Sequence, residues 1–184
     1  YHGCDKFTGK LALPNKLTTI GRKGFYGCSG FTGELVIPDS VTSIGISAFE
    51  RCQGFTSIKL PNSLETINKY AFYHCDNMKG TLNIPKSVKS IGEDAFTGIH
   101  FDLIRYTGTK IQCGNSVFYS GIKCEAPRAY SSSFLCGLAV TSRIEDKETK
   151  QSLHWYVYVA PAIIGLVVLI LIISLTVHYC QNLD

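Results

Sequence analysis

Cysteine and histidine are the residues of this 184-residue sequence that could ligate a metal or act as nucleophile and base. The five histidines are dispersed along the chain: His2, His74, His100, His154 and His178. No Cys-x-x-Cys pair or paired-histidine spacing of a metal site is present. His74 and Cys75 are neighbours, but Cys75 belongs to a repeated series of core positions. Because no nucleophile elbow or phosphate loop occurs either, the sequence predicts no catalysis, no metal site and no cofactor.

Four of the eight cysteines recur at steps of 24, 24 and 23 residues: Cys4, Cys28, Cys52 and Cys75. In a stacked structure such a series becomes a column. We favour a column of small apolar side chains facing the core, because cysteine outside a disulfide is among the most buried residue types. Disulfides along the column are the alternative in an oxidising compartment, if the geometry of each pair permits them.

The remaining cysteines follow this series. Cys113, Cys124 and Cys136 are disulfide candidates if the domain is extracellular, and three cysteines form at most one bridge among themselves. Cys180 stands alone beyond a long apolar segment. Cysteines in such a place are sometimes palmitoylated, and an unmodified thiol is the alternative.

The cysteine series is part of a longer repeat. Four segments share nearly the same motif: LPNKLTTIGRKGFYGC (13–28), IPDSVTSIGISAFERC (37–52), LPNSLETINKYAFYHC (60–75) and IPKSVKSIGEDAFTG (84–98). Three positions are constant and are predicted to anchor each unit: Pro14, Pro38, Pro61, Pro85, Ile20, Ile44, Ile67, Ile91, Phe25, Phe49, Phe72 and Phe96. A period of this length over four copies is typical of a stacked repeat architecture.

Within one unit the apolar positions predict a short strand. Leu35 and Ile37 alternate with Glu34 and Val36, which is the period of a half-buried strand. Pro38 ends the strand because it cannot donate to a ladder. A unit of this size buries too few side chains to be stable alone, so each coil must stack on its neighbours.

These repeats resemble those of the BspA-like leucine-rich-repeat family, found in surface proteins of bacteria and of some parasitic protists. The resemblance covers residues 1–98, where the chain starts in mid-repeat, and residues 106–137 resemble the degenerate closing segment of the protist members. It implies a β-rich leucine-rich-repeat solenoid with a repeat of 23–24 residues. The fourth copy has Ile99 near the cysteine position and the period fails after Phe96. We therefore predict a C-terminal cap at 99–140, since terminal repeats are atypical.

A single transmembrane α-helix is predicted at residues 156–178. The segment VYVAPAIIGLVVLILIISLTV (157–177) has 21 uncharged residues, 14 of them Val, Ile or Leu. About 20 apolar residues in a helix cross the hydrocarbon core of a bilayer. The lipid bilayer is therefore an expected partner, with a juxtamembrane stalk at 141–155 and a short tail at 179–184.

Two signals for the orientation disagree. The stalk carries Arg143, Lys147 and Lys150, whereas the tail has no Lys or Arg. The positive-inside rule alone would place the repeats in the cytoplasm, but long domains translocate largely regardless of charge. The resemblance implies a single-pass protein of the plasma membrane with its repeat domain outside the cell, and we favour that orientation.

Outward positions of stacked strands form parallel ladders, which give an extended surface for a partner. Two candidate ladders follow from the repeat: Thr18, Thr42, Glu65 and Lys89; and Thr19, Ser43, Thr66 and Ser90. Their hydroxyl groups could bind a protein or a glycan. The alternative is that threonine simply suits exposed strands and pairs with threonine across them.

The resemblance implies an adhesin or surface antigen that binds host-cell or matrix components. A surface receptor for uptake or for signalling through a partner is an alternative, and so is a membrane-anchored cytosolic repeat scaffold. The net charge of +4 is mild, and no basic stripe or motif indicates nucleic-acid binding. The sequence leaves the ligand and the oligomeric state open.

Overall fold

The computed structural model describes residues 6–144, which belong to one compact unit of the chain. The segment predicted to be a membrane helix (156–178), the tail, Cys4 and Cys180 lie outside the described residues. Within residues 6–144, no helix has the length and apolar character needed to cross a membrane.

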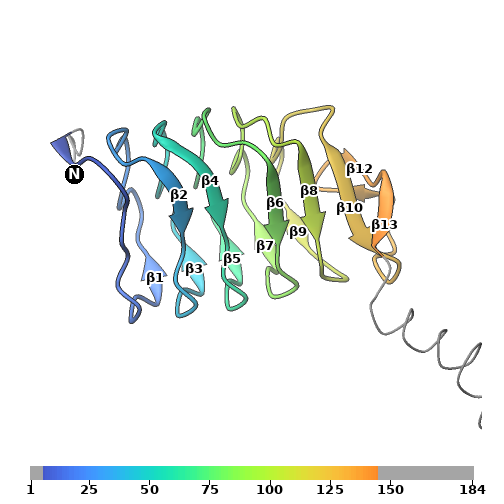
Figure 1. Ribbon diagram of the computed structural model, residues 1–184. Coiled ribbons are helices and arrows are strands. Elements are labelled where there is room, and N and C mark those ends of the chain that lie inside the picture. Colours follow the sequence, from blue (N-terminus) through green and yellow to red (C-terminus); the bar gives the residue numbers. More distant parts are fainter. Residues whose placement is uncertain (1–5, 145–184) are drawn as a thin grey trace, which may run out of the picture. The chain divides into compact units, whose positions relative to one another are not determined.

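The described residues wind into stacked coils, and each of five coils contributes a two-residue strand to one parallel sheet (Figure 1). The sheet follows the chain order: β1 (Thr19–Ile20), β3 (Ser43–Ile44), β5 (Thr66–Ile67), β7 (Ser90–Ile91) and β9 (Gln112–Cys113). The register places each isoleucine anchor beside the next, from Ile20 to Ile91. These four side chains are at most 2% exposed. The predicted β-rich solenoid is confirmed.

A second set of strands lies side by side along the stack: β2 (Gly33–Val36), β4 (Phe55–Lys59), β6 (Thr81–Ile84), β8 (Leu103–Tyr106), β10 (Lys123–Pro127) and β13 (Ser142–Ile144). β2 pairs with β4, and the other four form a parallel sheet in the order β13-β10-β8-β6. Leu35 and Ile37 are buried while Glu34 and Val36 are exposed, as the alternation predicted.

The phenylalanine anchors stack into a column at the centre of the coils. Consecutive ring centroids from Phe25 to Phe96 lie 5.1, 5.4 and 5.1 Å apart, and the rings are nearly parallel. The column then continues to Phe118, 5.3 Å beyond Phe96. The stack therefore has a fifth coil, although the period of the sequence motif fails after Phe96.

This fifth coil keeps the burial pattern of the repeat but not its residue types. Leu103–Tyr106 pairs in register with Thr81–Ile84, so that Tyr106 takes the place of Ile84. The phenol is fully buried and donates a 2.6 Å hydrogen bond to the carbonyl oxygen of Lys110. A buried hydroxyl needs such a partner, and the tyrosine thereby fills an isoleucine position.

After the fifth coil, a hairpin closes the stack. β11 (Phe134–Leu135) and β12 (Leu138–Ala139) are antiparallel, unlike all the other paired strands among residues 6–144. Leu135 and Leu138 point into the core, and β13 then adds to β10 as a parallel strand. The segment predicted as a cap (99–140) thus contains the fifth coil, and from here on the cap means residues 128–141 alone.

Candidate ligand-binding surfaces

The ladder predicted on the five-stranded sheet is formed in register. Its neighbours pair as Thr19 with Ser43, Ser43 with Thr66, and Thr66 with Ser90. Each residue precedes a buried isoleucine, so its side chain points away from the core. Gln112 continues the ladder beside Ser90. Sequence reasoning missed Gln112 because the fifth coil does not keep the short motif by which the first four copies were aligned.

The second predicted ladder is also contiguous, and its members form hydrogen bonds and an ion pair with one another. The backbone N–H of Thr42 donates to the carbonyl oxygen of Thr18 at 2.9 Å. Lys89 Nζ lies 2.8 Å from Glu65 Oε2, and both side chains are largely exposed. Such exposed pairs contribute little to stability, and this one neutralises the ladder's only two charges. The first ladder is therefore the better candidate for a binding surface.

A shallow groove of about 270 Å³ lies over the first ladder. We call it the ladder groove: Thr66, Asn68, Ser90, Gly92, Gln112 and Cys113 line it. It carries hydroxyl and amide groups and no charged side chain. This chemistry suits a ligand with many hydrogen-bonding groups.

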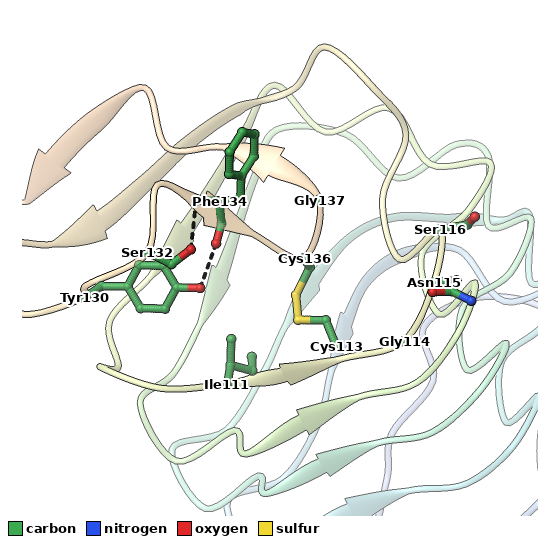
Figure 2. Close-up of a pocket in the computed structure, with 10 residues that line it drawn as sticks. All are labelled: Ile111, Cys113, Gly114, Asn115, Ser116, Tyr130, Ser132, Phe134, Cys136 and Gly137. Carbon is green, nitrogen blue, oxygen red and sulfur yellow. Dashed lines mark hydrogen bonds between the residues drawn. A yellow bond between two sulfur atoms is a disulfide. The ribbon is translucent and has the colours of Figure 1, made fainter.

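A second groove, of about 550 Å³, lies between the fifth coil and the cap (Figure 2). We call it the cap groove. Its wall contains a disulfide between Cys113 and Cys136, which joins the end of β9 to the turn of the hairpin. The phenol of Tyr130 donates to the carbonyl oxygen of Phe134 at 2.9 Å. Phe134 is 59% exposed, and Figure 2 shows its ring standing away from the disulfide.

The two grooves form one surface because both are lined by Cys113 and Gly114. Of the three disulfide candidates, Cys124 is left as a buried thiol. Burial raises the pKa of Cys124 to about 11, so that at neutral pH it is protonated and a poor nucleophile.

The cysteine column is buried. Cys28, Cys52 and Cys75 have no exposed surface, and Cys75 Sγ donates to the carbonyl oxygen of Phe49 at 3.0 Å. Desolvation raises the pKa of Cys75 well above its usual range. His74 Nδ1 instead lies 3.1 Å from Asp76 Oδ1. The adjacent His74 and Cys75 therefore lack the geometry of an activated thiol.

A third groove, of about 470 Å³, was not expected from the sequence. We call it the tyrosine groove, and six of its lining residues are Arg22, Lys23, Tyr26, Lys69, Tyr70 and Tyr73. These occupy the variable positions around the phenylalanine anchors of the first and third coils. Only the spacing of 47 residues between Arg22 and Lys69, and between Tyr26 and Tyr73, could have indicated it.

No cluster of three or more His, Cys, Asp or Glu side chains suited to a metal ion occurs within residues 6–144. The three grooves carry hydroxyl, amide, aromatic and charged groups at an open surface.

Residues 1–125 match the family model described as "BspA type Leucine rich repeat region", in six copies. Among solved structures, the chain is similar to a leucine-rich repeat protein of T. pallidum at 21% identity and a TM-score of 0.53, with 78% of each chain covered. It is also similar to a leucine-rich repeat protein of Bacteroides ovatus at 20% identity and a TM-score of 0.37, over 78% of this chain and 62% of that one. No curated protein sequence gave a significant match.

Proposed function

The chain belongs to the BspA-type leucine-rich repeat family, and we propose that it is a membrane-anchored surface protein that binds host-cell or matrix components. The binding surface is the ladder groove together with the cap groove. The proposal rests on one observation, that five coils align their outward side chains from Thr19 to Gln112 in a single register. An aligned row of hydroxyl and amide groups suits an extended protein or glycan ligand.

The disulfide supports the extracellular orientation. Cys113 and Cys136 are joined, and structural disulfides persist in oxidising compartments but are rare in the cytosol. This weighs against a cytosolic scaffold, which the charge distribution alone favoured. The uncharged segment at 157–177 supports a single-pass anchor.

The exposed groups of the cap groove support binding over catalysis. Phe134 offers an aromatic anchor beside the hydrogen-bonding ladder, and interfaces combine such anchors with polar surroundings. The free cysteine thiols of the described coils are buried. Burial also raises the pKa of Cys75 and of Cys124, so these two thiols are not suited to nucleophilic chemistry.

Adhesion of cells that display the full chain tests the proposal. Wells would be coated with matrix proteins or cultured epithelial cells, and the bound cells counted. The double variant Thr66→Ala/Ser90→Ala should weaken binding by about fivefold for each lost hydrogen bond, since one bond contributes roughly 1 kcal/mol.

The matched control is Thr56→Ala/Thr81→Ala, which removes two exposed hydroxyls from β4 and β6. It should bind like the unmodified chain. Equal loss in both double variants, or no loss in the ladder variant at equal surface expression, would refute the ladder as the binding surface.

A further inference from the structure

The tyrosine groove is a trough three coils wide. Its floor comes from the second coil, where Ile46 is 40% exposed and Glu50 is half-buried. Its walls come from the first and third coils. Because adjacent coils lie 5.1 and 5.4 Å apart at their phenylalanine rings, the walls stand about two strand spacings, roughly 10 Å, apart.

Each wall pairs a cation with an aromatic ring. Lys23 Nζ lies 5.1 Å from the centroid of the Tyr26 ring on one wall. Lys69 Nζ lies 4.7 Å from the centroid of the Tyr70 ring on the other. The ring of Tyr73 packs edge-on against Tyr70 with centroids 5.2 Å apart. These contacts hold the rings and ammonium groups in place at the surface.

The charges of the groove are unbalanced. It is lined by the three cations Arg22, Lys23 and Lys69, and by the single acid Glu50. Lys69 bonds to Glu93 of the fourth coil at 2.6 Å. Arg22 and Lys23 on the opposite wall have no acidic partner among residues 6–144. A ligand with negative charge on the side of the first coil complements this arrangement.

We propose that the tyrosine groove binds an acidic glycan. A sugar ring presents a flat face of C–H groups that packs on Tyr26, Tyr73 and the exposed Ile46. Its carboxylate or sulfate group meets Arg22 and Lys23, and the Glu50 carboxylate accepts hydrogen bonds from its hydroxyl groups. An acidic peptide could meet the same cations, but its Asp and Glu side chains offer the rings no flat face of C–H groups and offer Glu50 no set of hydroxyl groups.

This site is separate from the ladder and cap grooves. The inference rests on the proposed function only in that the coils must face ligands outside the cell. A binding measurement on the purified chain does not depend on that orientation, so the two ideas can fail independently.

The test uses the full chain in detergent micelles, with binding measured to an immobilised sulfated hexasaccharide, its desulfated counterpart and poly-glutamate. We expect the sulfated sugar to bind at least tenfold more tightly than the other two. Tyr73→Ala should weaken sugar binding by roughly tenfold, as loss of an aromatic hot-spot residue does. Arg22→Gln/Lys23→Gln, at two exposed positions, should remove the preference for sulfate.

The control for net charge is Lys59→Gln/Lys79→Gln, which removes two exposed cations outside the groove. Its sugar binding should match that of the unmodified chain. The proposal is overturned if this control loses as much affinity as Arg22→Gln/Lys23→Gln, if poly-glutamate binds as tightly as the sulfated sugar, or if no sugar binds. Thr66→Ala/Ser90→Ala should leave sugar binding unchanged, which separates this site from the ladder.

Discussion

The Sγ atom of Cys75 donates a 3.0 Å hydrogen bond to the carbonyl oxygen of Phe49 in the preceding coil. Cys52 makes the same bond, at 2.8 Å, to Phe25. The column of cysteines thus joins consecutive coils beside the phenylalanine column. This gives a physical reason for cysteine at a position where any small apolar residue would fit.

Cys75→Ala should lower the free energy of unfolding by about 2 kcal/mol, because it removes a buried sulfur and one hydrogen bond. Urea denaturation of the full chain measures the change. The thiol of Cys75 should also resist alkylation in the native state, since its pKa is raised by desolvation. An unchanged urea midpoint would show that the bond contributes no stability.

Gly45→Ala should destabilise the stack by about 3 kcal/mol, because the added methyl group overpacks a closed site. Its Cβ would lie 2.7 Å from the backbone N of Arg22 in the preceding coil. Gly27→Ala is the matched control, because Gly27 has φ of 68° with open space around it. This control should cost only about 1 kcal/mol, the strain of a left-handed alanine. Equal urea midpoints for the two variants would contradict the close approach.

Cys136→Ser should loosen the cap without unfolding the coils. The disulfide with Cys113 closes a loop with a sequence separation of 23, and such a loop is worth roughly 3 kcal/mol. Amide hydrogen exchange across β11 and β12 should therefore accelerate, while exchange at Phe49 and Phe72 stays slow. Unchanged protection of the hairpin would mean that packing of Leu135 and Leu138 alone holds the cap.

Stability should fall as the pH rises above 9, in part because of Cys124. Its pKa is raised from 9.0 to about 11 by burial. The unfolded state therefore loses the thiol proton first, and the stabilisation present below pH 9 disappears as the pH approaches 11. Urea midpoints between pH 8 and pH 11 should decline less steeply for Cys124→Ala. An identical decline in both proteins would contradict this assignment.

The periodicity of the sequence was sufficient to predict most of the fold. The anchors Ile44 and Phe49 recur with their neighbours at nearly constant spacing, and a side chain at such a position must point the same way in every coil. The short repeat motif did not reveal the fifth coil, which only the family model over residues 1–125 includes. Tyr106 replaces an isoleucine there, and its buried hydroxyl depends on a hydrogen bond to Lys110. Burial was preserved, but the residue types were not.

The candidate sites were less predictable. The register that aligns Thr66 with Ser90 follows directly from the repeat. The pairing of Cys113 with Cys136 depends on the path of the hairpin, which has no repeat. The tyrosine groove was missed because Tyr26 and Tyr73 occupy variable positions. Placing them on opposite sides of Glu50 requires knowledge of which side chains face outward.

We propose that the coils lie outside the cell, and labelling of an epitope tag near Glu148 separates this orientation from the reverse one. The full chain would be expressed in its native cell and stained before and after permeabilisation. Intact cells should be labelled, which would place the coils and their grooves outside. Labelling only after permeabilisation, with the protein at the plasma membrane, would contradict it.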